Sequence, residues 1–229
     1  MIPRGKSSKT RNIQLVANIN PKSPITEQYR LIRNNISFSS VDKVIKSIVV
    51  TSAESGDGKS TTAANLAIVL AQNGRKVLLV DGDLRRPTLH YAFFISNIDG
   101  ITSVLTKDSS LEMAINRTTI SNLDILPSGP IPPNPSELLD SQAMNMLMEE
   151  LKESYDYVIY DSPPILAVTD SQTIASKCDG VVMVIRSGKT HKIRALKAKE
   201  LLEKAGSQVL GVVINGVEEK MSGYYGHYG

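Results

Sequence analysis

The sequence predicts a single α/β domain with a mostly parallel central sheet and helices on both faces. Short apolar runs alternate with longer segments of helical periodicity through most of the 229 residues, and this order is typical of crossovers between parallel strands. Hydrophobic residues make up 41% of the chain, enough for a sizeable core. Three of the apolar runs end in residues that suit phosphate or metal, and parallel sheets bind ligands at that edge.

The early elements follow from periodicity and helix-end signals. A helix is expected over residues 26–38, with Thr26 as its N-cap just after Pro24. A strand over 46–52 is favoured by its run of β-branched residues. A glycine-rich loop then leads to a helix over 59–73, which has a broad apolar face and stops at a glycine.

The middle of the chain alternates shorter elements with loops. Strand 76–81 ends in an acidic sequence, and a proline-containing loop follows it. Short helical pieces near 100–106 and 110–116 precede strand 123–127. A proline-rich stretch then stays extended until a helix begins at about Ser136.

The last part of the chain is the most regular. The pattern predicts helix 141–153, strand 156–161, helix 169–176, strand 180–186, helix 190–204 and strand 208–214. We expect helix 190–204 to turn Ile193, Leu196 and Leu201 inward and its basic residues outward.

Three parts are predicted along the chain: a flexible basic segment over residues 1–20, the folded domain over 21–217 and a flexible tyrosine-rich tail over 218–229. The basic side chains near the start suit either a solvated tail or contact with a membrane surface. They are Arg4, Lys6, Lys9 and Arg11.

Composition narrows the classes of function. A net charge of +3 is too small to indicate a nucleic-acid partner. The single cysteine, Cys178, excludes an internal disulfide and fits a reducing cytoplasm. No apolar stretch approaches the roughly 18 residues that a membrane span needs, and no secretory signal opens the chain. We therefore expect a cytoplasmic protein with no nucleic-acid partner.

The loop AESGDGKS, after the first strand, carries the strongest chemical signal. Small residues allow backbone N–H groups to surround phosphate oxygens, a lysine neutralises the β- and γ-phosphates, and a hydroxyl binds Mg²⁺. Ala53 replaces the first glycine of the usual G-x-x-x-x-G-K-S/T pattern, but the part that touches phosphate is kept. The predicted nucleotide-binding residues are Ser55, Gly56, Asp57, Gly58, Lys59, Ser60 and Thr61.

Two other apolar runs end in carboxylates. KVLLVDGD ends in Asp81 and Asp83, which share a face of an extended segment, and VIYDSPP contains Asp161, which fits a metal-binding role through water. Each aspartate could instead cap a helix or a turn. Arg85 and Arg86 suit either contact with the transferred phosphate or pairing with these acids.

These motifs resemble those of a known family. VLLVDGDLRRP and VIYDSPP are similar to the Walker A′ and Walker B motifs of the deviant-Walker P-loop ATPases. Within that superfamily, TSAESGDGKST, DGDLRRPTLH, SGPIPPNPSELL, DSPP and the tyrosine-rich C-terminus resemble the bacterial protein-tyrosine kinases (BY-kinases) of capsule and exopolysaccharide operons, over residues 25–229. The cytoplasmic Gram-positive form is the most similar. Partition ATPases carry a signature lysine where this chain has Glu54, which argues against that class.

The resemblance implies an ATP- and Mg²⁺-dependent protein-tyrosine kinase on a single P-loop NTPase domain. Asp81 would accept the proton of the tyrosine hydroxyl, and Asp83 would support the metal together with Ser60 and Asp161. Lys59 completes the implied catalytic set. Asn215 resembles the adenine-side asparagine of the superfamily, although a turn asparagine beside a glycine explains it equally well.

The resemblance also implies self-assembly and self-modification. The implied oligomerisation motif, E-x-x-R-x-x-R, consists of Glu27, Arg30 and Arg33, and the implied autophosphorylation sites are Tyr224, Tyr225 and Tyr228. The alternative for the motif is an intrahelical ion pair on a solvated face, worth a few tenths of a kcal/mol. The alternative for the tail is an inert end.

The implied partners are a separate transmembrane adaptor, which activates the kinase and recruits it to the inner face of the cell membrane, an octameric ring of the chain itself, protein substrates of polysaccharide synthesis and a cognate tyrosine phosphatase. Two other functions stay open on the residues alone. One is an ATPase switch of the partition or positioning class, and the other is a nucleotide-gated scaffold without kinase activity.

Overall fold

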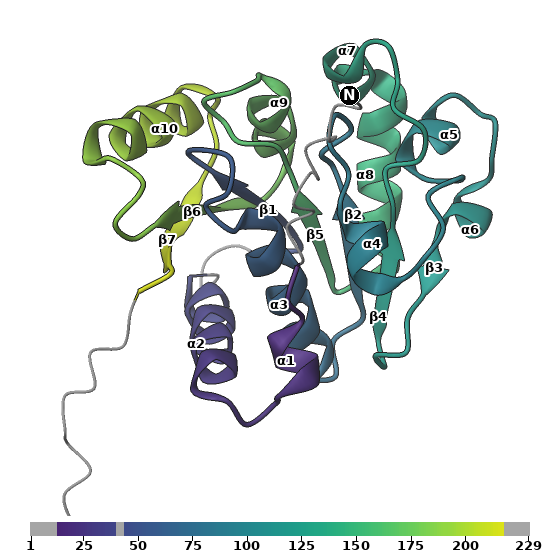
Figure 1. Cartoon of the computed structure of the whole chain (residues 1–229). Coiled ribbons are helices and arrows are strands. Elements are labelled where there is room, and N and C mark those ends of the chain that lie inside the picture. The colour runs from purple at the N-terminus through teal and green to yellow at the C-terminus, as the bar shows by residue number, and fades with distance from the viewer. Residues whose placement is uncertain (1–12, 40–43, 218–229) are drawn as a thin grey trace, which may run out of the picture.

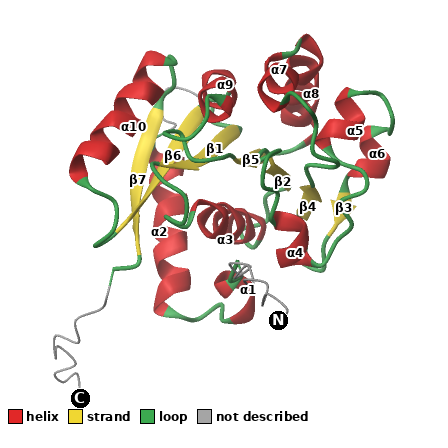
Figure 2. Ribbon diagram, turned by 45° about the horizontal axis from the view of Figure 1, so that its top comes forward, coloured by secondary structure: helices red, strands yellow, loops and turns green. Residues whose placement is uncertain are grey.

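The computed structural model describes residues 13–39 and 44–217, which form one sheet covered by helices on both faces (Figures 1 and 2). The strands in these ranges are β1 (Ser47–Ser52), β2 (Val77–Asp81), β3 (Asn116–Arg117), β4 (Leu123–Leu126), β5 (Tyr157–Asp161), β6 (Gly180–Arg186) and β7 (Val209–Asn215). The helices are α1 (Val16–Ile19), α2 (Pro24–Phe38), α3 (Lys59–Ala71), α4 (Leu89–Phe93), α5 (Ile101–Leu105), α6 (Leu111–Ala114), α7 (Pro135–Asp140), α8 (Gln142–Ser154), α9 (Asp170–Lys177) and α10 (Lys192–Lys204).

The strands are arranged in the order β3-β4-β2-β5-β1-β6-β7. The pairs are parallel except for β3 and β4, which are antiparallel. The predicted mostly parallel sheet is therefore confirmed. No helix in the described ranges is both long enough and apolar enough to cross a membrane.

Two apolar clusters hold the layers together, one on each face of the sheet. The first joins the sheet to α1, α2, α3 and α4, and the second joins it to the later helices from α5 to α10. Strand β1 lies between both clusters and is buried along its whole length, as its apolar sequence SIVVTS requires. The two layers therefore fix β1 and α3, and the loop between them is anchored at both ends.

The start of α2 differs from the sequence prediction. The helix begins at Pro24, and Ser23 is the N-cap because its Oγ accepts a hydrogen bond from the Thr26 N–H at 3.1 Å. Proline fits this first turn because no N–H is needed there. Thr26 is buried, and its hydroxyl donates to the carbonyl of Asn20 at 2.8 Å. The prediction of Thr26 as the N-cap was wrong.

Helix α1 was not predicted and lies in the segment expected to be flexible. A buried amide on α3 holds it: the Ala17 N–H donates to Asn65 Oδ1 at 2.9 Å, and Asn65 Nδ2 donates to the Gln14 carbonyl at 2.7 Å. Residues 1–12, which carry the basic cluster, lie outside the described residues.

The inner face of α10 also differs from the prediction. Ile193 and Leu196 are 81% and 56% exposed, whereas Ala198 and Leu202 are the buried residues. Leu201 is partly buried against the core, as expected. Helix α10 lies beside the last strands of the sheet and covers only a narrow apolar surface there. One small and one large buried side chain, Ala198 and Leu202, are enough to fill this contact. Helix α4 and strand β3 were not predicted either.

Candidate functional site

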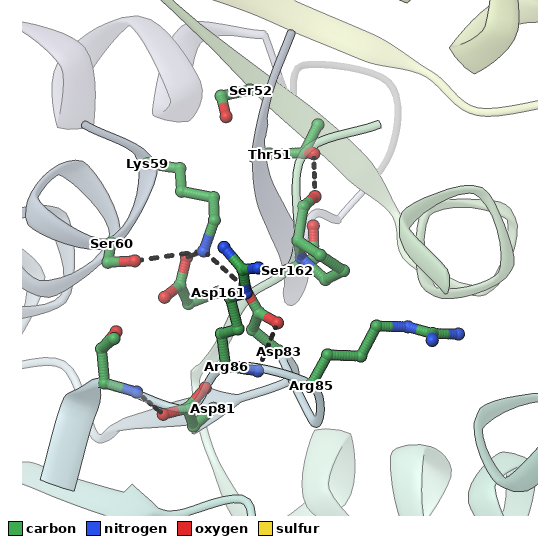
Figure 3. A network of polar contacts seen from close by, with 12 residues as sticks. Thr51, Ser52, Lys59, Ser60, Asp81, Asp83, Arg85, Arg86, Asp161 and Ser162 are labelled. Atoms are coloured by element: carbon green, nitrogen blue, oxygen red, sulfur yellow. Dashed lines mark hydrogen bonds and ion pairs between the residues drawn. The ribbon is translucent and has the colours of Figure 1, made fainter. Parts of the chain in front are cut away.

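The candidate site lies at the carboxyl edge of the three central strands. Strand β5 is between β2 and β1, and the pairing places Asp161 opposite both Val50 and Asp81. Strands β2 and β5 thereby end level, and β1 continues two residues further before the phosphate loop. The predicted phosphate loop, the Asp81–Asp83 segment and Asp161 consequently meet at one place (Figure 3).

The phosphate loop connects β1 to α3 in a conformation that needs glycine. Gly56 and Gly58 have φ angles of +85° and +103°, a region that other residues rarely adopt. A Cβ on Gly58 would lie 1.9 Å from Nδ2 of Asn215, so a side chain there would displace the Asn215 amide. Gly58 is the N-cap of α3 and offers no side-chain cap. The first N–H groups of this helix are left for an anion.

Lys59 is the cation at the centre of the site. Its Nζ lies 3.2 Å from Asp83 Oδ2, 3.3 Å from Asp161 Oδ1 and 3.2 Å from Ser60 Oγ (Figure 3). Burial opposes the charged ammonium, but the carboxylates, Asp161 first, outweigh it, so the pKa of Lys59 is raised. Lys59 is therefore a fixed positive charge within reach of the residues predicted to bind metal.

Asp81 is a fully buried carboxylate with two different oxygens. Its Oδ2 accepts from the N–H groups of Thr88 and Leu89, at the start of α4, at 2.9 and 3.0 Å. Its Oδ1 has no hydrogen-bond partner. Burial and the charge of Asp161 raise the pKa of Asp81 to about 7, against the lowering effect of these N–H groups and Lys59. A carboxyl with such a pKa suits proton transfer near neutral pH.

The residues predicted to hold metal lie together around Lys59. Burial raises the pKa of Asp161, and Lys59 opposes this effect. Asp161 Oδ2 is a second buried oxygen without a partner. The described residues contain no group of three or more His, Cys, Asp or Glu side chains fit to hold an ion. Mg²⁺ is commonly bound by one or two carboxylates together with phosphate oxygens, so Ser60, Asp83 and Asp161 fit it.

Asn215, at the end of β7, reaches the phosphate loop. Its Nδ2 donates to the Asp57 carbonyl at 2.9 Å. Thr61 lies in the first turn of α3, where its carbonyl accepts from Asn65 at 2.8 Å. The structure thus brings the predicted nucleotide-binding residues, from Ser55 to Thr61, together with Asn215.

The two arginines after Asp83 have different positions. Arg85 makes two hydrogen bonds, of 2.8 and 3.0 Å, to Asp170, a fully buried residue of α9. Figure 3 shows the Arg85 side chain directed away from the acids and that of Arg86 directed toward them. From the sequence, Arg85 could either contact phosphate or pair with the aspartates of the site. In the structure it pairs with Asp170 instead.

The implied oligomerisation motif lies on α2, away from the acids. Arg30 forms an exposed ion pair with Glu27. Arg33 donates to the Val69 carbonyl of α3 at 3.2 Å. The predicted acceptors Tyr224, Tyr225 and Tyr228 lie outside the described residues.

Sequence reasoning missed three cations that touch the phosphate loop. Arg186, Lys189 and Arg194 lie on or beside the connection between β6 and α10, more than 120 residues after the loop. None of the three belongs to a recognisable sequence motif. The only sequence signal is that all three fall in the basic stretch from Arg186 to Lys204, most of which is the predicted helix 190–204.

Comparison with known proteins agrees with this geometry. A family model described as an AAA domain matches residues 45–203. The tyrosine-protein kinase YwqD of Bacillus subtilis (strain 168) is 54% identical over 223 residues, which are 97% of this chain and 93% of the relative.

Two solved structures extend the likeness to the fold. The chimerical protein CapA2B2 is 48% identical, with a TM-score of 0.85 and coverage of 87% of this chain and 88% of the other. The kinase domain of the Escherichia coli tyrosine kinase ETK is 32% identical, with a TM-score of 0.87 and coverage of 98% and 87%. The chain therefore belongs to the bacterial tyrosine-protein kinases, whose kinase domain is built on the P-loop ATPase fold.

Proposed function

We propose that this chain is an ATP- and Mg²⁺-dependent kinase that phosphorylates its own C-terminal tyrosines between subunits and so regulates capsular or exopolysaccharide synthesis and export. One observation carries the chemistry. The buried carboxylate of Asp81 has a free oxygen and a pKa raised to about 7, and it lies at the same sheet edge as the phosphate loop.

The residues divide the reaction between them. Lys59 and the first N–H groups of α3 hold the β- and γ-phosphates of ATP. The Oδ1 atom of Asp81 accepts the proton of the tyrosine hydroxyl, whose oxygen forms the bond to the γ-phosphorus. The bond to the β–γ bridging oxygen breaks, and ADP leaves with that oxygen. Mg²⁺, held by Ser60, Asp83 and Asp161, would offset the negative charge of the phosphates.

The nucleotide site extends to Asn215. Its contact with the Asp57 carbonyl and the closeness of Gly58 place it beside the phosphate loop. We assign it to the adenine side of the site, as the family resemblance implies.

Assembly would place an acceptor tail beside a neighbour's Asp81. The exposed Glu27 and the half-exposed Arg30 and Arg33 on α2 support a contact between copies in an octameric ring. A transmembrane adaptor would recruit the ring to the inner face of the cell membrane and activate it. Proteins of polysaccharide synthesis would be further substrates, and a cognate tyrosine phosphatase would reverse the modification.

A mixing experiment tests transfer between subunits. A Lys59→Met chain with an intact tail is combined with an active chain whose Tyr224, Tyr225 and Tyr228 are replaced by Phe. Mg-ATP is added, and phosphotyrosine on each chain is measured by mass spectrometry. Phosphate should appear on the Lys59→Met chains alone. Circular dichroism first verifies that this variant folds, because Lys59 neutralises two buried carboxylates.

Two outcomes would contradict this proposal. If neither chain is labelled while ATP is still hydrolysed, the kinase proposal fails and an ATPase switch takes its place. If the Lys59→Met chains also become labelled when no active chain is present, Lys59 does not hold the transferred phosphate.

A further inference from the structure

The phosphate loop has an unfavourable charge for its task. Residues 53–60 contain two acids, Glu54 and Asp57, against one base, Lys59. Asp57 is fully buried. Its Oδ2 accepts from the Glu54 N–H at 2.9 Å, whereas its Oδ1 has no hydrogen-bond partner. A buried carboxylate beside a polyanionic ligand repels that ligand unless a cation offsets it.

Three cations from one connection of the chain reach this loop. Lys189 Nζ donates to the Ser55 carbonyl at 2.8 Å and lies 3.8 Å from Asp57 Oδ1. Arg186 donates to the Gly56 carbonyl at 3.2 Å. Arg194, in the first turn of α10, forms an ion pair with Glu54. Each acid of the loop therefore has one cation from the β6–α10 region: Lys189 for Asp57 and Arg194 for Glu54.

These contacts also orient the backbone of the loop. In a trans peptide the C=O and N–H groups point in opposite directions. Lys189 and Arg186 bind the carbonyls of Ser55 and Gly56 from the β6–α10 side. The N–H groups of Gly56 and Asp57 are consequently held toward the other side, as a phosphate-binding loop requires.

The placement is costly for α10 itself. The first turn of this helix contains Lys192 and Arg194 and no acidic residue. Cations at a helix N-terminus are unfavourable by about 0.3–1 kcal/mol each, because they lie at the positive end of the helix dipole. Local helix stability does not explain a base at position 194, whereas the ion pair with Glu54 does.

We propose that Lys189, assisted by Arg186 and Arg194, is a positioning residue that offsets the carboxylates of the phosphate loop within the same chain and thereby sets the affinity for nucleotide. The β6–α10 connection is then part of the nucleotide site, although it contains none of its motifs. This inference rests on the nucleotide-binding part of the proposed function and adds the groups that set its strength.

Calorimetric titration of the full-length protein with Mg-ATP tests the proposal through charge compensation. Lys189→Met should weaken ATP binding about tenfold. Asp57→Asn in the same background should return the affinity to within about twofold of the parent, because the repelling charge is removed while the amide oxygen still accepts from Glu54. Lys189→Arg should bind nearly as tightly as the parent. Thermal unfolding of each variant checks that the fold is retained.

Lys192→Met is the matched control. It removes the same charge three residues further along the chain, at the first position of α10. The structure shows no hydrogen bond or ion pair of Lys192 within the described ranges, so ATP affinity should change less than twofold. Equal losses in Lys189→Met and Lys192→Met would overturn the proposal, because the effect would then be that of net charge. The proposal would also be overturned if the Lys189→Met/Asp57→Asn double variant bound ATP as weakly as Lys189→Met. This titration reports ATP binding and is independent of phosphate transfer. A protein that binds ATP normally but transfers no phosphate in the mixing experiment would refute the kinase proposal and leave the present one intact.

Discussion

The two oxygens of Asp81 show how one carboxylate is prepared for proton transfer. Two N–H groups hold Oδ2 in place, and Oδ1 is left without a partner in a buried position. The ionised form is disfavoured by burial and by Asp161, which raises the pKa to about 7. Orientation and basicity therefore come from different neighbours of the same side chain.

Asp81→Asn should separate chemistry from binding. The amide can still accept the two N–H bonds, but it cannot accept a proton, so tail phosphorylation should fall by about 10²–10⁴ while Mg-ATP affinity changes much less. In the parent protein kcat/KM should rise with pH through about 7, as Asp81 ionises. Quantitative phosphotyrosine assays over pH 5.5–9 measure both effects. Parallel losses of rate and affinity would instead make Asp81 a binding residue.

The same variant has a defined effect on stability. The folded-state pKa of Asp81 lies above its usual value of 3.8, so its stabilising contribution is present at low pH and is lost as pH rises through about 7. At pH 8 the free energy of unfolding of Asp81→Asn should therefore exceed that of the parent by an amount on the order of 1 kcal/mol, and the variant should melt at a higher temperature. The difference should shrink at pH 5.5. Calorimetric melting at both values checks the sign.

At the scale of elements, the Arg85–Asp170 pair ties the loop after β2 to the start of α9. Asp170 is completely buried, and Arg85 is its partner through two hydrogen bonds. Removing the arginine leaves a buried carboxylate uncompensated. Because the Arg85 side chain is 39% exposed, we expect Arg85→Met to reduce the free energy of unfolding by about 1–3 kcal/mol.

Denaturant unfolding measures this loss, and a second variant identifies its cause. Asp170→Asn in the Arg85→Met background should recover much of the stability, because no unpaired charge is then buried. If the double variant is less stable than Arg85→Met, the arginine contributes by packing rather than by charge. Arg86→Met removes a neighbouring arginine without an ion pair in the described part of the chain, and it should have a smaller effect.

Asn65 of α3 makes two of the side-chain hydrogen bonds that hold helix α1 and the residue before it, and Gln72, just after α3, makes a third to the Ala17 carbonyl. Asn65 is buried and bonds to backbone groups of both Gln14 and Ala17. Asn65→Ala would leave these groups without partners, so the protein should lose about 1–3 kcal/mol of stability. Exposed Asn73, just after the same helix, provides the control substitution. Hydrogen exchange should show faster exchange at Ala17 in Asn65→Ala alone, and unchanged protection there would contradict this role.

The order of strands and helices was predictable because it follows from local periodicity. The acids and the phosphate loop could also be located, because parallel strands end at one edge. The existence of α1 and the exposed face of α10 were not predictable, because they depend on partners distant in sequence: Asn65 holds α1 from a position 48 residues away from Ala17. The start of α2 is a local feature, since its N-cap Ser23 bonds to the N–H of Thr26 three residues later. Lys189 was missed for the same kind of reason as α1, because its partners Ser55 and Asp57 are more than 130 residues away and it belongs to no motif.

At the scale of the whole molecule, α2 presents the charges that the ring would use. Replacing Glu27, Arg30 and Arg33 together by Ala should yield a folded species of smaller mass in light scattering. The Glu27–Arg30 pair lies at the surface and contributes little to the monomer, and the bond from Arg33 to the Val69 carbonyl is a small further loss. A matched triple variant on α10, Lys199→Ala with Glu203→Ala and Lys204→Ala, removes the same number of acids and bases from another exposed face. It should keep the parent mass. Equal masses for all three proteins would refute the role of α2.

The position of β5 in the sheet has a consequence for synthesis of the protein. Strands β1 and β2 do not pair with each other, because β5 lies between them. The ribosome releases β5 last of the three, so β1 and β2 have no shared strand in the sheet until about residue 161 has emerged. We therefore expect the edge that carries the phosphate loop and Asp81 to take its final form late in synthesis, when β5 inserts between the two strands.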